Sequence, residues 1–378
     1  MNRILKGLLA ALIALSFLWA CADEWDYGDY VPQKDLGSGD LQVHFLNMSR
    51  NDAILICCGG EYAFIDSGSH IHGEKSAEYM QQLSIDGLKY YIGTHAHTDH
   101  VGGAGPILAT IGAEKILTNQ PLAIKAMLDK AETAAEKKAI SNTAYEYVSM
   151  GAVYTIGGAT LTCIGPKSIV RRANYKDGLE NENSLIFRLE YGNVSFVLTG
   201  DATSDKLWQL LQDNEHALDC TVFKHPHHNT DMSDRVAQKL KCSYYVFSTG
   251  YNYSPSTHQI YNALRTGARV FITSNHNSGT VVFTTDGERV GVETENTLDE
   301  KWSLEISKVT LKVGGSKSYS RNMRPSHMID TLYFSTSDPN VATVDPCIGK
   351  ITAVGKGSCT VTALAFDGTS RQISVTVK

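Results

Sequence analysis

The sequence lacks a strong net charge, a compositional bias and any long apolar segment after residue 20. The 378 residues carry 34 Lys and Arg against 40 Asp and Glu, a net charge of −6, which argues against non-specific nucleic-acid binding through bulk charge. Hydrophobic residues make up 42% and charged residues 20%, ordinary values that exclude a largely disordered, collagen-like or coiled-coil chain. Without further apolar stretches the chain encodes no membrane channel. At roughly 100–200 residues per domain, its length predicts two domains.

Residues 1–22 have the order of features that is typical of a secretory signal peptide. Two basic residues precede an uncharged apolar run from 7 to 20, which is too short to span a bilayer comfortably. The tripeptide ACA at 20–22 fits ordinary signal peptidase, whereas LWAC, ending at Cys21, resembles a bacterial lipobox in which Cys21 becomes lipidated. We favour an exported cell-surface lipoprotein, with a freely secreted chain and an uncleaved anchor as the alternatives.

Composition divides the remaining chain into a linker and two domains. Residues 23–40 are acidic and aromatic without a sustained period, and we interpret them as a linker. Between 41 and 293, apolar strand patterns alternate with amphipathic helical patterns, which predicts one α/β domain. Residues 304–378 are rich in Val, Thr, Ser and Gly, in short strands at regular spacing. This pattern predicts a small all-β sandwich.

The cysteines are divided between the predicted core and one predicted disulfide. Cys57 and Cys58 lie in the apolar strand pattern AILICC, so we expect them in the core. Cys347 and Cys359 flank a predicted hairpin in a chain that we expect to be exported. They are therefore the expected disulfide.

One six-residue segment concentrates metal-binding side chains. The strand pattern KYYIGT runs into HAHTDH, which holds His95, His97, Asp99 and His100. Alternation puts the first two histidines on one side, and the other two residues extend from the following turn. Neutral imidazole and carboxylate groups are the ligands of zinc-type divalent ions. Two groups that diverge from one loop predict two metals side by side.

Further ligands are expected where other apolar strands end. Asp66 ends the pattern YAFID, and Asp201 ends VSFVLTGD, where its carboxylate could bridge two ions. His225, His227 and His228 follow the strand pattern CTVFK. Polar residues that terminate strands gather at one edge of an α/β layer, where binding sites form.

These motifs resemble the metallo-β-lactamase superfamily. HAHTDH, the preceding FIDSG, the later LTGD and the final His motif carry this resemblance. Over 41–292 the chain is similar to the ComEC-type branch, through LQVHFLNMSRNDAILI, NENSLIFRL, FKHPHHNT and STHQIYNALRTGARVF. That branch is the soluble hydrolase domain attached to bacterial DNA-uptake channels, and it also occurs in free-standing secreted hydrolases. The resemblance implies an αββα sandwich with a two-metal site at one edge.

The tail of the chain resembles a second family. The segments VATVD, GKITAVGKG and TVTA within 304–378 are similar to the bacterial Ig-like domain of group 2. Such domains are common in surface and secreted proteins of bacteria, where they space or attach a catalytic domain. This segment shows no catalytic constellation.

The resemblance to the hydrolase family implies two ligand sets. It implies that the first metal is held by His95, His97 and Asp201. It implies that the second metal is held by Asp99, His100, Asp201 and His227. We expect two divalent metals, zinc by preference and manganese as the alternative. The family's additional His before the bridging Asp is missing, since no His occurs from 101 to 200. The branch's Asn/Ser motif is matched by Asn183 and Ser184, so Asn183, water or substrate would complete the first metal.

The resemblance also implies roles around the metals. Asp66 would support the site, and Asp99 would orient the attacking hydroxide as well as bind metal. His228 would contact the substrate or orient a ligand, and His258, which opens a predicted helix, would protonate the leaving group. Arg171 and Arg172 could meet phosphate oxygens, with an ordinary solvated loop as the alternative.

The predicted function is that of an exported hydrolase whose two metals lower the pKa of a shared water, giving hydroxide. A phosphodiester in nucleic acid or in a phosphorylated envelope polymer is the expected substrate. Hydrolysis of esters, amides or lactams is the alternative, and a non-catalytic surface binding module is the alternative from another class. The envelope is the expected partner of the anchor and of the Ig-like domain; the sequence indicates no protein partner. Ser49-Arg50-Asn51 stands where the branch has Gly-Gln-Gly, which leaves the substrate preference open.

Overall fold

A computed structural model describes most of the chain after residue 39. It covers residues 40–171, 174, 178–230, 232–250, 255–264, 266, 268–274, 278–296, 303–318, 333–346, 349–364 and 370–378. The predicted signal peptide with Cys21, nearly all of the predicted linker, Arg172 and Cys347 lie outside these residues. Within them, no helix has both the length and the apolar character needed to cross a membrane.

The α/β unit, residues 41–294, contains two sheets. The first sheet is built from β1 (Leu41–Phe45), β2 (Ile54–Cys58), β3 (Glu61–Ile65), β4 (Leu88–Gly93), β5 (Ala113–Thr118), β6 (Ala144–Tyr147), β14 (Val281–Thr285) and β15 (Val290–Thr294). The second is built from β7 (Val153–Ile156), β8 (Ala159–Gly165), β9 (Ile186–Tyr191), β10 (Val194–Leu198), β11 (Val222–Lys224), β12 (Tyr244–Phe247) and β13 (Arg269–Ile272). Their orders are β15-β14-β1-β2-β3-β4-β5-β6 and β13-β12-β11-β10-β9-β8-β7.

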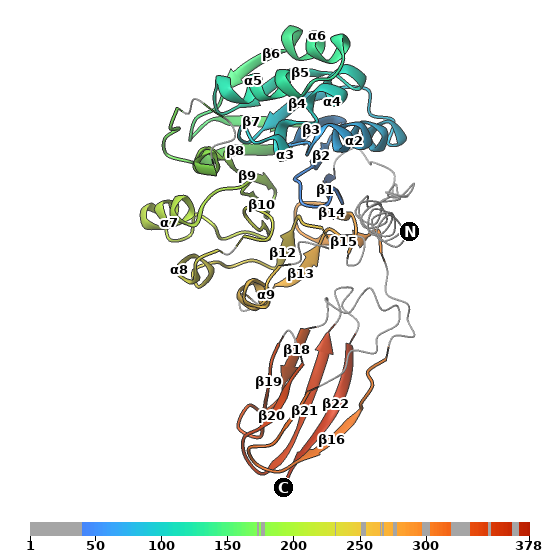
Figure 1. The fold of residues 1–378 in the computed structure, drawn as a ribbon, viewed down its shortest axis with the longest axis vertical. Helices are drawn as coiled ribbons and strands as arrows, with labels where there is room; N and C mark the ends of the chain where they lie inside the picture. Colours follow the sequence, from blue (N-terminus) through green and yellow to red (C-terminus); the bar gives the residue numbers. More distant parts are fainter. Residues whose placement is uncertain are drawn as a thin grey trace, which may run out of the picture. The chain divides into compact units, whose positions relative to one another are not determined.

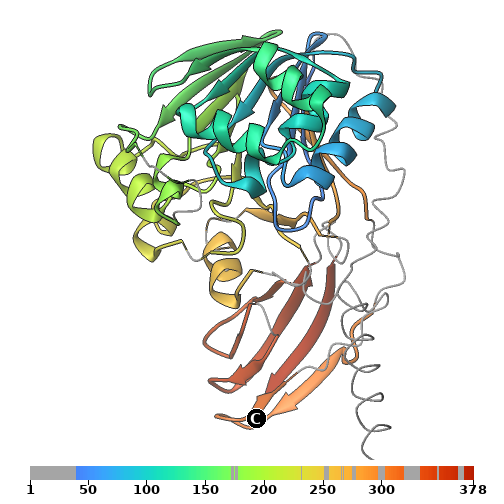
Figure 2. The same cartoon turned by 45° about the horizontal axis from the view of Figure 1, so that its top comes forward.

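Helices cover the outer face of each sheet (Figures 1 and 2). Those beside the first sheet are α2 (His70–Gln82), α3 (Thr98–Val101), α4 (Ala104–Thr110), α5 (Pro121–Lys130) and α6 (Ala134–Asn142). Those beside the second are α7 (Ser204–Asp213), α8 (Asp234–Ala237) and α9 (Thr257–Leu264). The 3-10 helix η1 (Gly178–Asn183) lies between β8 and β9 in the sequence. The result is the αββα sandwich that the sequence predicts.

The position of the two sheets between helices explains why their central strands are buried on both faces. The five residues of β1 are all buried, as are those of β2, because each has a sheet on one side and helices on the other. Phe283 of β14 forms edge-to-face contacts with Phe45, Phe196 and Phe271, at centroid distances of 5.7–6.0 Å. Cys57 and Cys58 are buried in this unit, as expected.

The strand directions bring selected loops to one edge of the sandwich. Strands β3, β4 and β5 are parallel to one another, as are β10, β11 and β12. The loops that follow each set therefore start at the same edge of their sheet. In the first sheet these loops begin with Asp66 and His95, and in the second they contain Asp201 and His225–His228.

The C-terminal unit is all-β, as predicted. Its strands are β16 (Lys308–Leu311), β17 (Ser316–Lys317), β18 (Tyr333–Thr336), β19 (Ala342–Val344), β20 (Ile351–Ala353), β21 (Gly357–Leu364) and β22 (Ser370–Val377). They form two sheets, in the orders β16-β22-β21-β18 and β17-β20-β19. Val361, Ile373 and Ile351 lie in the core between them. Cys359 is buried there; its pairing with Cys347 stays a prediction, because Cys347 lies outside the described residues.

Candidate metal centre

Asp201 lies at the middle of the cluster that the two sets of loops form. Its side chain is buried, and it follows Gly200, whose φ is +49°. A Cβ on Gly200 would lie only 2.8 Å from Ser184 Oγ and 3.0 Å from Thr94 Oγ1. Glycine is therefore required by both the backbone conformation and the space, and it allows the carboxylate to enter the cluster.

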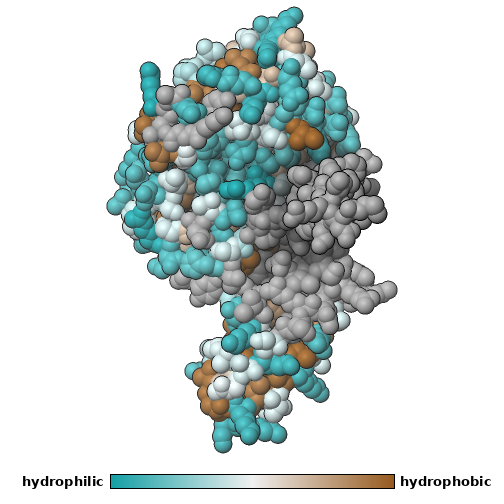
Figure 3. Space-filling model, viewed as in Figure 1, coloured by the Kyte–Doolittle hydropathy of each residue, from teal (hydrophilic) through white to brown (hydrophobic). Residues whose placement is uncertain are grey.

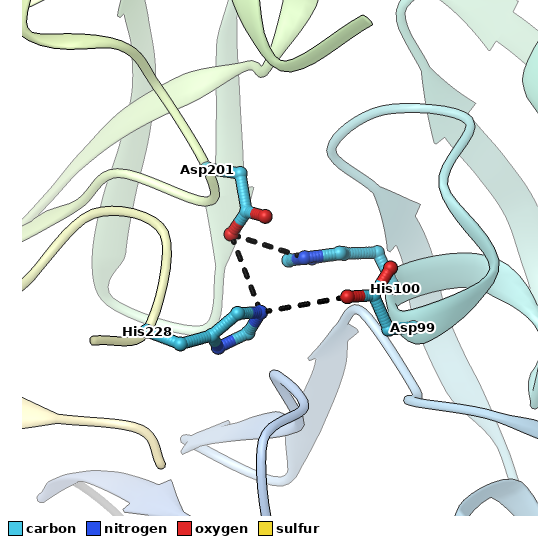
Figure 4. A group of neighbouring side chains, drawn as sticks. All are labelled: Asp99, His100, Asp201 and His228. Atoms are coloured by element: carbon cyan, nitrogen blue, oxygen red, sulfur yellow. Dashed lines mark ion pairs between the residues drawn. The ribbon is translucent and has the colours of Figure 1, made fainter. Parts of the chain in front are cut away.

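One oxygen of Asp201 faces a group of two histidines and a second carboxylate. Oδ1 lies 3.0 Å from His100 Nε2 and 3.5 Å from His228 Nε2, and the latter atom is 3.8 Å from Asp99 Oδ2. Figure 4 shows the four side chains pointing toward a common centre. Their ligand atoms all lie within 4.8 Å of one another. These are the dimensions of a site for one ion.

The other oxygen of Asp201 faces a second group. Asp201 Oδ2 lies 4.0 Å from His95 Nε2, which in turn is 3.0 Å from His97 Nδ1. These three residues also offer ligand atoms within 4.8 Å of one another. The structure thus brings together His95, His97 and Asp201 as the sequence proposes, with Asp201 shared between two groups.

Hydrogen bonds on the outer side of the histidines fix which nitrogen each presents. His100 Nδ1 lies 2.7 Å from Asp66 Oδ2, so Nδ1–H donates to the carboxylate and Nε2 faces Asp201. Asp66 also accepts hydrogen bonds from the backbone N and Oγ1 of Thr94. For His95, Nδ1 lies 3.1 Å from Ser184 Oγ, and Ser184 Oγ accepts a hydrogen bond from Asp201 N. Outer partners of this kind orient metal-binding imidazoles.

The paired histidines differ from the assignment made from the sequence. The group that contains Asp99 and His100 includes His228, not His227. His228 is fully buried, and its Nδ1 donates a hydrogen bond to Ser248 O at 3.0 Å, which leaves Nε2 to face the centre. His227 is 30% exposed, and its Nε2 lies 3.7 Å from Asp201 Oδ2, on the side of the first group. His228 thus lies at a candidate ligand position, and its expected contact with the substrate stays a prediction.

The backbone explains this arrangement. His227 and His228 have φ of 50° and 56°, in the left-handed region that non-glycine residues seldom adopt. Two such residues in a row turn their rings into the cluster from different directions. Strained backbone of this kind is concentrated at functional sites.

The side-chain oxygen and nitrogen of Asn183 both make hydrogen bonds within the protein. Its Oδ1 accepts a hydrogen bond from Val170 N, and its Nδ2 donates to Val170 O and to Glu180 Oε2. Asn181 instead lies beside the centre, with Nδ2 at 3.3 Å from both ring nitrogens of His227. The residue expected to complete the first metal is therefore a loop anchor. Asn181, two residues earlier in the chain, is the asparagine that contacts a histidine of the site.

His258 and Arg171 are described outside the two groups. The side chain of His258 is 54% exposed and its Nε2 lies 2.8 Å from Asp234 Oδ1, with Asn262 as a further partner. Arg171 is exposed, and Arg172 lies outside the described residues. The structure therefore does not bring His258 into the cluster of histidines and aspartates.

The face of the molecule in Figure 3 is mainly hydrophilic where it is coloured, with separate hydrophobic patches.

A buried ion pair lies behind the second group, and the sequence analysis did not single it out. Lys224, the last residue of β11, is fully buried and bonds through Nζ to Asp52 Oδ2 and, at 3.0 Å, to Gly200 O. Asp52 Oδ1 lies 3.5 Å from His228 Nδ1, and Oδ2 lies 4.0 Å from His100 Nδ1. Two signals for this pair were present in the sequence. Lys224 ends the apolar pattern CTVFK, and Asp52 directly precedes the apolar pattern AILICC.

Burial and charge set the protonation of the cluster. Burial, assisted by the charge of His100, lowers the pKa of His95 well below its usual value. Burial also opposes the charged form of His100, but the carboxylates of Asp201 and Asp66 outweigh it and raise the pKa well above its usual value. Burial disfavours the ionised form of Asp201, yet the charges of His100 and His228 lower its pKa well below normal. Without a bound metal, the ionised carboxylate of Asp201 therefore lies beside a protonated His100 and a neutral His95.

The orphaned polar atoms fit divalent metals. Both oxygens of Asp201, His100 Nε2 and His228 Nε2 are buried. Although Asp201 Oδ1 lies 3.0 Å from His100 Nε2, none of the four atoms makes a hydrogen bond of good geometry among the described residues. Buried polar atoms in proteins are nearly always paired, so four that converge indicate a missing partner. Imidazole nitrogens and carboxylate oxygens suit zinc and similar ions. These residues fit two divalent ions that share Asp201.

Two family models match the sequence. Residues 49–248, more than half of the chain, match the model of the metallo-beta-lactamase superfamily, and residues 301–377 match the bacterial Ig-like domain (group 2). No curated protein sequence gives a significant match. The chain belongs to the metallo-β-lactamase superfamily and carries a bacterial Ig-like domain at its C-terminal side.

Solved structures match parts of this chain at low sequence identity and with TM-scores below 0.5. A metallo-beta-lactamase of Cronobacter sakazakii with a HARLDQ motif is 17% identical over 42% of this chain, with a TM-score of 0.32. The match covers 61% of that enzyme, less than two thirds of its length. A metallo hydrolase of the archaeon Ignicoccus hospitalis is 12% identical over 65% of this chain and 98% of its own, with a TM-score of 0.42. A diphosphatase of the PhnP family is 14% identical over 55% of this chain and 85% of its own, with a TM-score of 0.36.

Proposed function

We propose that this protein is an exported hydrolase, a phosphodiesterase with two metals. The observation that carries the proposal is the buried carboxylate of Asp201, whose two oxygens face two separate histidine groups. A shared carboxylate holds two ions close together, and a pair of ions suits in-line displacement at phosphorus. The resemblance of residues 41–292 to the ComEC-type branch points to the same class of substrate.

We further propose that His227 completes the first metal in place of the missing histidine. Its Nε2 lies 3.7 Å from Asp201 Oδ2, the oxygen that faces His95. The first metal would then be held by His95, His97, Asp201 and His227. The second would be held by Asp99, His100, Asp201 and His228. Zinc is the preferred ion for this set of nitrogen and oxygen ligands, with manganese as the alternative.

The chemistry follows from the ions together with the residues around them. When bound, two divalent ions supply a Lewis acid and lower the pKa of a water toward neutrality. Asp99, with a side chain that is 44% exposed, is the carboxylate of the second group that solvent reaches most easily. It can therefore orient the attacking water and accept its proton. Buried His95, His100 and His228 cannot exchange with solvent in this way and serve to bind.

A cation near the exposed side of the cluster supports an anionic substrate. Burial lowers the pKa of His227, Asp201 opposes this shift, and the positive charge of Arg50 contributes to it. Arg50 belongs to the turn that departs from the branch's Gly-Gln-Gly, and Ser49 in the same turn has φ of 56°. A guanidinium near His227 can bind a phosphate oxygen in bidentate fashion. Uncharged esters and amides have no comparable need for it.

The test is hydrolysis of bis(p-nitrophenyl) phosphate and single-stranded DNA by the purified protein with Zn²⁺ or Mn²⁺. We expect metal-dependent turnover that falls at least about 100-fold in Asp99→Ala and His228→Ala, since each removes a ligand. His216→Ala is the matched control, because His216 is 61% exposed and pairs with Asp219. A protein that binds two metals without turning over either substrate would contradict the phosphodiesterase. Fewer than two metals and no turnover would favour the surface binding module.

We also propose that the enzyme is held at the cell surface through lipidated Cys21, with the Ig-like domain as a spacer. The lipobox-like LWAC supports the anchor, and the Ig-like domain of group 2 is typical of bacterial surface proteins. The test is incorporation of labelled palmitate in cells that express the wild type or Cys21→Ser. Label in the wild type alone is expected. Equal labelling of both, or of neither, would contradict the anchor.

A further inference from the structure

Glu180 is a buried carboxylate directly behind the first histidine group. It lies in η1 and is fully buried. Oε1 accepts hydrogen bonds from Gln120 Nε2 at 2.8 Å, Ala96 N at 3.3 Å and Asn119 Nδ2 at 3.5 Å. Oε2 accepts from Asn183 Nδ2 at 2.8 Å and Gln120 Nε2 at 3.0 Å. Within the described part of the chain, all of these donors are uncharged amides.

Burial of a carboxylate costs free energy unless hydrogen bonds or a cation replace its contacts with water. An ionised group without a cation depends entirely on hydrogen bonds for compensation when it is buried. Here the donors come from three separate segments: the turn after β4, the start of α5 and η1 itself. The carboxylate therefore joins these segments at one point, and the point includes the peptide between His95 and His97.

We propose that Glu180 is a positioning residue that fixes the His95–Ala96–His97 turn and so sets the affinity of the first metal position. The inference rests on the two-metal centre of the proposed function but not on its substrate. Ala96 N is the backbone group between the two ligands, and its bond to Glu180 limits rotation of the peptide that carries both. The rings can then keep Nε2 of His95 and Nδ1 of His97 3.0 Å apart.

The second metal position has a different support. His100 is oriented by Asp66, and His228 by Ser248 O. Neither support has a hydrogen bond to Glu180 in the described structure. Loss of Glu180 should therefore weaken one metal position and spare the other, which general destabilisation would not do.

The experiment is a titration of metal-free protein with Zn²⁺ against a competing chelator, repeated with Co²⁺ by absorption spectroscopy. Glu180→Gln keeps the shape of the side chain and removes its charge. We expect one binding constant to weaken about 10- to 100-fold and the other to keep its wild-type value, as for loss of an outer partner of a ligand. His97→Ala is the reference for a protein that lacks the first position. Glu182→Gln is the matched control, since its side chain is 33% exposed and faces Lys206 at 3.9 Å.

Each outcome decides the proposal. Selective weakening of the position that His97→Ala also loses, with the Co²⁺ spectrum of the other position retained, supports it. Wild-type values for both positions, or equal weakening of both, overturn it. If Glu180→Gln does not fold, Gln120→Met decides, because it keeps the carboxylate and removes two of its hydrogen bonds, both from Gln120 Nε2. A smaller selective loss then supports the proposal, and unchanged binding overturns it. A wild type that binds one ion alone would refute the two-metal centre itself, and this is visible before any variant is compared.

Discussion

Removal of the Lys224 side-chain charge should strongly destabilise the α/β unit. Lys224 and Asp52 are 0% and 1% exposed, and Nζ bonds to both Asp52 and the Gly200 carbonyl. Lys224→Met keeps much of the volume but leaves a buried carboxylate without its cation. Breaking a buried pair in this way costs about 3–5 kcal/mol. For a unit of this size we expect Tm to fall by roughly 6–20 °C.

The double variant tests the reason for the loss. Asp52→Asn combined with Lys224→Met removes both charges, so we expect it to recover most of the lost stability, with a coupling energy of at least about 2 kcal/mol. The assay is urea unfolding followed by tryptophan fluorescence and far-UV circular dichroism, with linear extrapolation. Lys89→Met is the control: Lys89 pairs with Glu61 at the surface, where such a pair contributes about 1 kcal/mol or less.

A purely additive result would refute the reasoning. If the double variant is less stable than Lys224→Met by the full cost of Asp52→Asn, the two charges do not compensate each other. Lys224 would then act through packing alone. In that case the charge of Asp52 would not explain why its Oδ1 lies 3.5 Å from His228 Nδ1.

Three further predictions concern other parts of the α/β unit. Burial lowers the pKa of His44 from 6.5 to about 3, so between these values the unfolded chain binds a proton that the folded chain does not. The free energy of unfolding then falls as pH decreases through this range, by up to about 1.4 kcal/mol per pH unit. In urea unfolding at a series of pH values, His44→Asn should make this pH dependence less steep, and an unchanged pH dependence would contradict the role of His44. Phe283→Ala opens a cavity between the sheets and should cost about 3–5 kcal/mol in the same assay, whereas a loss below about 1 kcal/mol would show that the contacts of Phe283 are not part of a tight core. Asn183→Ala removes two hydrogen bonds to Val170 and should speed limited proteolysis of the segment around 170; unchanged cleavage would contradict the anchoring role.

The fold and the centre of the site were predictable because their signals are local. The alternation of strands and helices indicates an α/β domain, and HAHTDH concentrates four candidate ligands in six residues. The αββα sandwich itself is what the resemblance to the metallo-β-lactamase superfamily implies. Asp201 could be identified because a carboxylate follows an apolar strand. In each case the chemistry of the residue and its place at a strand end are both visible in the sequence.

The choice between neighbouring residues was not predictable. His227 and His228 adopt consecutive left-handed conformations, so no strand or helix period tells which ring faces which metal. Asn181 and Asn183 lie in a 3-10 helix, where two residues of separation change the direction of the side chain. Glu180 and Lys224 were missed as site residues because charged residues are usually exposed, and only the tertiary structure supplies their partners.

The most direct test of the account is an anomalous diffraction map from crystals grown with Zn²⁺. We predict two peaks on either side of Asp201. One should lie at about 2.0–2.2 Å from the ligand atoms of His95 and His97, and the other at the same distance from those of His100 and His228. A single peak, or two peaks that do not share Asp201, would contradict the two-metal centre.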